Sequence, residues 1–357
     1  MALTTARTGL TPQQWDDKFF MEYVRENRFK RYMGTDENSI IQLKEDLTKK
    51  KGDKVTFAAV NKLTGAGVTG NTTLEGNEEE LDTRSMAVTV APLRHAVAVT
   101  NWDEQKSTIE LRDTAKMALK MWSMEKMKTA IITALGSING VAYADASEAQ
   151  KDAWLVDNSD RVLFGATKSN ASSNDHSTSL ANIDNTSDKL SPAIISLAKR
   201  IAQSASPAIR PIRLSEDEEW FVMFCGPQAF RDLSNDTTMT QANRDARTRG
   251  MDNPLFTGGS LIWDGVIIRE IPEIAAVSNG TIDCNPNYLV GAQALGIAWA
   301  QRTKTTTQVT DYGFRNGVGV QEMRGIEKLL FGSGAGDTDD LKQHGVVTVW
   351  TAGVADT

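Results

Sequence analysis

The sequence contains very few cysteines and histidines, and this scarcity excludes several kinds of site. The two cysteines, Cys225 and Cys284, are far apart and match no metal-binding or redox spacing. We expect both to be buried free thiols in a reducing compartment. The three histidines, His95, His176 and His344, include no pair with metal-ligand spacing, so the sequence indicates no histidine metal site.

Motifs for catalysis and phosphate binding are also missing. Gly65–Gly70 spells G-x-G-x-x-G, but another strand follows it instead of the helix that a dinucleotide site needs. Gly332–Gly336 lacks the lysine of a phosphate-binding loop, and Asp337–Asp340 lacks the glycine and distant glutamate of a calcium loop. No G-x-S-x-G elbow is present. We therefore expect no cofactor, no metal and no enzymatic activity; a soluble enzyme with scattered catalytic residues is the less favoured alternative.

Long hydrophobic runs are absent. The longest apolar stretch, Leu289–Ala300, is broken by Gln293 and is too short to span a bilayer. The first ten residues have no apolar core of the kind that a signal peptide needs. A net charge of −7 argues against a surface that grips nucleic-acid phosphates. We expect a chain of 357 residues that folds in water as two or three lobes, without a membrane partner.

The most regular stretch of the sequence, Ser107–Leu135, predicts one long helix. Ser107 and Glu110 have the S-x-x-E spacing of a capping box, and no proline or glycine follows before Gly136. Apolar residues recur close to the helical period along the stretch. At about 1.5 Å per residue such a helix is on the order of 40 Å long, enough to serve as the backbone of the fold.

A long two-stranded hairpin precedes this helix. Lys54–Val60 and Arg84–Ala91 alternate as strands do, and a further strand is expected around Arg94–Thr100. The intervening residues, Asn61–Asp82, are rich in glycine, threonine, asparagine and glutamate. Because a two-stranded ribbon is only marginally stable alone, we expect it to lie on a neighbouring molecule.

The far end of the hairpin is acidic. The carboxylates there are Glu75, Glu78, Glu79, Glu80 and Asp82. They form either a solvated tip or a docking surface for basic groups of a neighbouring subunit. The basic groups considered for this role are Arg28, Lys30, Arg31, Arg244, Arg247 and Arg249.

The first fifty residues are polar, with amphipathic segments at Pro12–Tyr32 and Glu37–Thr48. They contain too little apolar surface to form a domain. Two interpretations stay open for the first segment: an arm that lies across another subunit, or a helix that packs on its own domain.

The rest of the chain predicts both helices and strands. Lys168–Ser191 is dense in polar residues and is expected to be an exposed loop or insertion. Ser191 and Pro192 predict the start of a helix that runs to about Ser204. The further helices and strands expected are Trp220–Cys225 (a buried strand), a helix from Gly226-Pro227 through Leu233, a polar helix at Thr237–Arg249, and strands at Leu261–Trp263, Val266–Ile271, Tyr288–Gln301, Thr303–Asp311, Gly317–Leu330 and Gly345–Thr351.

Asp264-Gly265 between two of these strands is a strong signal for a tight hairpin turn. Runs of helices separated from runs of strands indicate the α+β class.

The order of these elements resembles the major capsid proteins of tailed bacteriophages. That family has the Johnson fold, with an N-terminal arm, an extended loop called the E-loop, a P-domain built on a spine helix, and an A-domain. The stretches that carry the resemblance are Gly70–Leu81, Leu93–Trp122, Val222–Leu233, Asp311–Phe331 and Gly345–Ala352.

The resemblance implies a division of the chain into five parts. These are an N-terminal arm at 1–52, an E-loop hairpin at 53–101, the P-domain spine helix at 102–139, mainly A-domain at 140–305 with a variable loop at 165–191, and P-domain strands at 306–357. It also implies a virion protein that is assembled in the host cytoplasm into hexamers and pentamers of an icosahedral head around double-stranded DNA. A phage tail or decoration protein is the alternative within the structural class.

The resemblance implies that the main partner is another copy of the same chain. Portal, scaffolding and decoration proteins are further expected partners, and packaged DNA lies nearby without sequence-specific binding. The residues expected at contacts between subunits are Gly65, Gly67, Gly70, Leu74, Glu75, Glu78, Glu79, Arg28, Arg31, Arg244 and Arg247.

Overall fold

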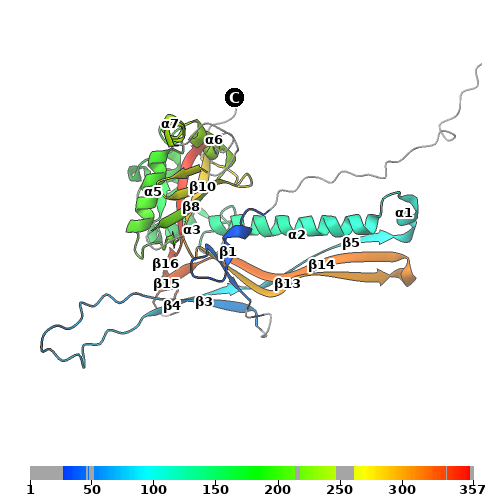
Figure 1. Ribbon diagram of the computed structural model, residues 1–357, viewed down its shortest axis with the longest axis horizontal. Helices are drawn as coiled ribbons and strands as arrows, with labels where there is room; N and C mark the ends of the chain where they lie inside the picture. Colours follow the sequence, from blue (N-terminus) through cyan, green and yellow to red (C-terminus); the bar gives the residue numbers. More distant parts are fainter. Residues whose placement is uncertain are drawn as a thin grey trace, which may run out of the picture. The chain divides into compact units, whose positions relative to one another are not determined.

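The computed structural model describes residues 27–45, 47, 52–213, 218–246, 261–334 and 336–353. These residues form two compact units of mixed helix and sheet (Figure 1). One unit contains Pro92–Met127 and Gln301–Met323, and the other contains Arg28–Ala91, Lys128–Ala300 and the chain from Arg324 onward. Four elements have residues in both units: helix α2 (Leu111–Gly136) and strands β5 (Ala91–Thr100), β13 (Leu295–Thr310) and β14 (Arg315–Lys328).

The first unit joins the long helix to the outer parts of long strands. Its elements are β5 (Ala91–Thr100), α1 (Asn101–Lys106), α2 (Leu111–Gly136), β13 (Leu295–Thr310), the turn η5 (Asp311–Gly313) and β14 (Arg315–Lys328). In the sheet, β14 lies between β13 and β5. Leu119 of the helix packs on Val318 and Val320 of β14, which buries the apolar side of this part of the helix.

The predicted long helix is confirmed, but its predicted start is wrong. α2 begins at Leu111 and includes Gly136 as its last residue. Ser107 instead closes the preceding helix α1, where its N–H donates to the Asp103 carbonyl. Its hydroxyl accepts from the N–H of Ile109 at 3.1 Å, so it does not form the capping box expected with Glu110.

The second unit is built on an eight-stranded sheet. The strands follow the order β6 (Val162–Phe164), β17 (Val346–Gly353), β12 (Asp283–Val290), β8 (Glu219–Cys225), β10 (Val266–Glu270) and β9 (Leu261–Trp263), with the short strands β7 (Ile212–Arg213) and β11 (Val277–Ser278) paired to β8 and β12. The helices of this unit are α3 (Glu148–Asp157), α4 (His176–Ala181), α5 (Pro192–Ser204), α6 (Pro227–Asn235) and α7 (Thr237–Ala246).

Two apolar clusters hold this sheet and its helices together. Ile194, Ile195 and Ala198 recur at helical spacing on α5 and pack with Phe221 and Met223 of β8. A second cluster joins α3 to β6 and β17; its largest members are Trp154, Leu155, Phe164 and Trp350. The buried strand predicted at Trp220–Cys225 and the helix predicted from Pro192 to Ser204 are therefore confirmed.

The tight turn predicted at Asp264-Gly265 is also confirmed. Both residues have positive φ angles, 48° and 71°, between antiparallel strands β9 and β10. Ser191 occupies the cap position before α5, but its side chain makes no capping hydrogen bond. The predicted polar helix is α7 from Thr237 to Ala246, and its last predicted residues lie outside the described part of the chain.

The polar stretch 168–191 was expected to be an exposed loop, and that expectation is wrong. It contains the short 3₁₀ turn η4 (Lys168–Asn170) and helix α4, capped by the Asp175 side chain. Leu180 and Ile183 are buried in the second apolar cluster. The many serines and aspartates supply local caps and turns, while a few apolar residues are enough to anchor the segment.

The remaining strands are short. They are β1 (Met33–Gly34), β2 (Ile41–Lys44), β3 (Lys54–Val60), β4 (Thr83–Thr89), β15 (Leu330–Ser333) and β16 (Asp339–Gln343), with the turn η2 at Lys30–Tyr32. The amphipathic segment 37–48 thus contains strand β2, which pairs parallel to the first residues of β13. Most of the segment 12–32 lies outside the described residues.

The strands of the C-terminal region lie in different sheets. β14 lies between β13 and β5, whereas β17 pairs with β12 along its whole length. Within the part of the chain that the structure describes, none of the helices is both long and apolar enough to cross a bilayer.

The second apolar cluster yields a stability prediction. Leu155→Ala removes a side chain that is 2% exposed, so we expect a loss of about 2–5 kcal/mol in the free energy of unfolding. Val156→Ala, next to it on α3 but 57% exposed, is the control and should change stability by less than about 0.5 kcal/mol. Urea denaturation of the unassembled protein measures both; equal losses would contradict the packing described here.

Candidate subunit-contact surfaces

The base of the β3–β4 hairpin is firmly packed in its own chain. Val55, Phe57 and Val88 are buried against Leu329 and Phe331. These residues alternate along the strands, so one face of the ribbon is apolar and enters the core.

Hydrogen bonds fix the same base. The N–H and hydroxyl of Ser85 both donate to a carboxylate oxygen of Asp337, at 2.8 Å each. The Lys44 ammonium donates to the Thr56 carbonyl at 2.9 Å and lies over the ring of Phe57. The hairpin therefore starts from a rigid platform within its own unit.

Beyond this base, the segment Asn61–Asp82 has no cover among the described residues. From Lys62 to Asp82 every residue except Val68 is exposed. Leu63, Leu74 and Leu81 are about 60% exposed, which is unusual for leucine. The sequence predicts that this segment packs on no part of its own chain. Its exposure among the described residues agrees with that prediction.

Three glycines give the segment its bends. Gly67, Gly70 and Gly76 have φ angles of 69°, 71° and 87°, values that other residues adopt only at a cost. None of the three meets another atom at the position of an added Cβ. Their conformation, and not close packing, is therefore what requires glycine here.

Glu79 has a role that the sequence did not reveal. Its carboxylate accepts from the N–H groups of Thr64 and Gly65, at 2.6 and 2.8 Å, and so ties the two arms of the segment together. These backbone hydrogen bonds lower the pKa of Glu79. Within the described chain Glu79 lies across its own loop, and its expected contact with a neighbouring subunit stays a prediction.

The other acidic residues of the segment differ in how they are held. Glu78 accepts from the N–H of Gly76 at 2.7 Å, and Asp82 accepts from the side chain of Asn61. Glu75 and Glu80 form no hydrogen bond or ion pair with any described residue.

The arginines proposed from the sequence are not brought together with these carboxylates among the described residues. The Arg28 guanidinium donates to the Glu270 carbonyl at 2.6 Å, and Arg31 lies over the ring of Tyr32. Arg244 is exposed on α7, beside a shallow hollow of about 620 Å³. Arg247 lies outside the described residues.

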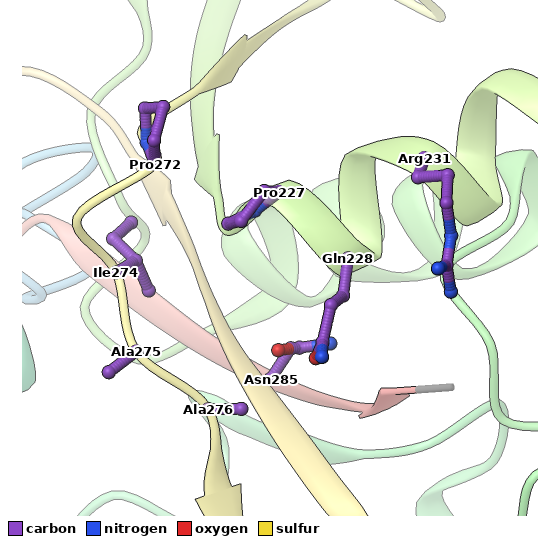
Figure 2. A pocket seen from close by; sticks show the side chains of 8 residues that line it. All are labelled: Pro227, Gln228, Arg231, Pro272, Ile274, Ala275, Ala276 and Asn285. Atoms are coloured by element: carbon purple, nitrogen blue, oxygen red, sulfur yellow. The ribbon is translucent and has the colours of Figure 1, made fainter. Parts of the chain in front are cut away.

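A separate pocket of about 480 Å³ opens at the start of α6 (Figure 2). Gln228 and Arg231 of α6 line one wall, Ile274 lies opposite, and Asn285 of β12 forms the floor. One buried amide atom each of Gln228 and Asn285 has no hydrogen-bond partner. The lining contains no nucleophile and no acid–base pair, so the pocket has no evident chemistry. The sequence predicts only the helix from Gly226-Pro227 through Leu233 here, because the other walls come from distant segments.

His176 and the two cysteines take structural positions. His176 is buried among the rings of Tyr143, Phe164 and Trp350, and burial lowers its pKa to about 4. Cys225 and Cys284 are buried free thiols, as the sequence predicted, and burial raises the pKa of Cys284 to about 12. No group of metal-ligating side chains occurs within the described ranges.

A buried lysine holds the end of the long helix. The Lys328 ammonium, on β14, donates to the carbonyls of Leu135 and Ser137 at 3.2 and 2.6 Å. These lie at the negative end of α2, where a cation is stabilised. Burial nevertheless lowers the pKa of Lys328 to about 7.

Lys328 predicts a pH dependence of stability. Its folded pKa of about 7 lies below its ordinary value of 10.5, so between these pH values the unfolded chain binds more protons than the folded chain. This group therefore makes stability rise from pH 7 to pH 10. The change in urea midpoint between pH 7 and pH 10 is measured for the parent chain and for Lys328→Met. The difference between the two changes is the contribution of Lys328, because the other groups titrate alike in both. We expect the parent's midpoint to gain more with pH than the variant's; parallel curves would contradict this.

The hydrogen bonds of Glu79 predict that its replacement loosens the loop without lowering the stability of the whole chain. Glu79→Ala removes the link between the two arms, so trypsin should cut faster after the exposed Lys62 while the urea midpoint stays unchanged. Glu80→Ala is the matched control, because Glu80 has no partner among the described residues. Equal cleavage rates in the parent and in Glu79→Ala would show that the link does not hold the loop.

Comparisons with known proteins agree with this arrangement. A family model described as phage capsid protein matches residues 4–355. The major capsid protein of Pseudomonas phage KPP25 is 28% identical, over 95% of this chain and 94% of its own length. The solved capsid of cyanophage Pam1 is 37% identical with a TM-score of 0.88 and covers both chains completely. The capsid of Ralstonia phage GP4, at 20% identity and a TM-score of 0.74, supports the fold alone.

These matches cover nearly the whole chain, and they confirm both the resemblance stated from the sequence and the tailed-phage capsid fold. The exposed hairpin segment and the long helix are thus features of a structural virion protein. The chain belongs to the phage capsid protein family, as a major capsid protein of a bacteriophage head.

Proposed function

We propose that copies of this chain assemble into hexamers and pentamers that tile an icosahedral head around double-stranded DNA. Assembly takes place in the host cytoplasm. Portal, scaffolding and decoration proteins are the further partners, and the packaged DNA is enclosed without sequence-specific binding. The net charge of −7 supports this last point, because a strongly basic protein would hold the DNA phosphates tightly.

The observation that carries the proposal is the exposure of residues 61–82. Leu63, Leu74 and Leu81 are open to solvent in the single chain, beyond a base that is well packed. Fully burying one such side chain is worth about 1.5–3 kcal/mol before the cost of ordering the loop. A neighbouring copy supplies the surface that the single chain lacks, so stability belongs to the lattice.

The domain assignment stays part of the proposal, with the E-loop hairpin at 53–101, the P-domain spine helix at 102–139, mainly A-domain at 140–305 and P-domain strands at 306–357. The hairpin β3–β4 with residues 61–82 is the E-loop, α2 is the P-domain spine helix, and the eight-stranded sheet is the core of the A-domain. We place the N-terminal arm at residues 1–52 and the A-domain at the centre of each ring. Positive-φ glycines, above all Gly67 and Gly70, let one loop fit both five-fold and six-fold rings.

The proposed contact residues fall into two groups. The loop residues that meet the neighbour are Gly65, Gly67, Gly70, Leu74, Glu75, Glu78 and Glu79. Glu79 also shapes the loop through its hydrogen bonds to Thr64 and Gly65. The candidates on the receiving side are Arg28, Arg31, Arg244 and Arg247, and Arg28 also donates to the Glu270 carbonyl of its own chain.

Deleting the loop tests this proposal. Replacing Asn61–Asp82 by a short Gly-Ser turn should leave the urea midpoint nearly unchanged, because the loop makes few contacts with the core. The variant should form no particles in negative-stain microscopy, since it has lost its contact with the neighbour. Particles of normal size and yield from the deletion variant would contradict the proposal, and so would loss of folding.

A further inference from the structure

The outer half of strand β13 has an open edge. β2 pairs with β13 only along Leu295–Ala298, and β14 occupies the other side of the strand. Along residues 301–310 no described strand pairs with the free edge, and residues 302–310 are all exposed. The stretch is rich in β-branched threonine and contains no proline, so it can accept another strand.

This open edge is basic. Residues 301–310 include Arg302 and Lys304 but no carboxylate. Thr303 donates to a Glu322 carboxylate oxygen to which Ser123 of α2 also donates, so Thr303 lies on the face of the strand that carries Glu322. Arg302 and Lys304 therefore lie on the opposite face. Lys304 forms no hydrogen bond or ion pair with any described residue.

The exposed loop offers a matching strand. Residues 77–82 are without secondary structure. The Asn77 N–H donates to the Leu74 carbonyl and the Asp82 carbonyl accepts from the Asn61 N–H, but the backbone groups of residues 78–81 have no backbone partner among the described residues. Glu79 points across the loop to Thr64 and Gly65. In an extended chain Glu78, Glu80 and Asp82 then share the other side, and Glu80 has no partner among the described residues.

We propose that residues 77–82 of one copy add as a strand to the open edge of β13 in a neighbouring copy, with Glu80 opposite Lys304. This rests on the proposed function, since it names the surface that receives the loop. Complementary charge favours the loop as the segment that pairs with this edge. Residues 61–82 carry five carboxylates and one lysine, whereas the charged residues at 301–310 are only Arg302 and Lys304. Pairing the edge with its own copy would set like charges against each other, which is unfavourable.

A charge exchange tests the pairing. Lys304→Glu and Glu80→Lys should each raise the critical concentration for assembly about fivefold, and the double variant should return to within about twofold of the parent. Lys120→Glu is the control for charge alone, on the exposed side of α2, and should have little effect. No rescue in the double variant, or an equal effect of Lys120→Glu, would overturn the proposal.

A cysteine pair gives a second, independent readout. Glu80→Cys with Lys304→Cys should form a ladder of covalently linked chains in oxidised particles, while the buried Cys225 and Cys284 stay unreacted. Particles without a ladder would overturn the pairing but leave the proposed function intact. Linked dimers from Lys304→Cys alone would show that β13 of one copy pairs with β13 of another. If the double variant forms disulfides within single chains and none between chains, the loop pairs with β13 of its own chain. Either result would overturn the proposal.

Discussion

A two-stranded ribbon cannot bury both its faces by itself. In the hairpin β3–β4, packing against the rest of the chain ends at Val60, the last residue of β3. Up to that point Val55, Phe57 and Val88 enter the core of their own unit. Beyond it, apolar leucines and unpaired backbone groups face solvent. The single chain does not bury this surface. Its burial against a neighbouring copy can therefore contribute favourable free energy to assembly.

The rest of the described chain gives this segment a fixed origin. Asp337 holds Ser85 at the base of the hairpin, and Lys44 covers Phe57. Lys328 joins β14 to the end of α2 through two carbonyls, at the cost of burying an ammonium group. In the proposed assembly, a rigid base with a glycine-bent end lets the loop reach the same neighbour in rings of different symmetry.

Much of the fold could be predicted from local patterns. The apolar spacing from Pro192 to Ser204 and the alternation from Lys54 to Val60 fix a helix and a strand almost to the residue. Asp264-Gly265 identifies a hairpin because few other turns tolerate two positive φ angles in succession. Local patterns of this kind predict secondary structure correctly where it is determined by residues close in sequence.

The predictions that failed, and the bonds that the sequence did not reveal, depended on distant residues or on competing local bonds. Ser107 has the spacing of a helix cap, yet its hydroxyl binds Ile109 and its N–H closes another helix. The stretch 168–191 is anchored by Leu180 and Ile183, whose partners come from elsewhere in the chain. Glu79 lies in an acidic run whose members cannot be told apart by sequence, and only the fold of the loop selects it for Thr64 and Gly65.

The central claim is that residues 61–82 are covered by a neighbour and not by their own chain. Cryo-electron microscopy of assembled particles measures this directly. The account predicts that density for Leu63, Leu74 and Leu81 is buried against an adjacent subunit. A shell in which these leucines stay exposed, or fold back onto their own subunit, would contradict it.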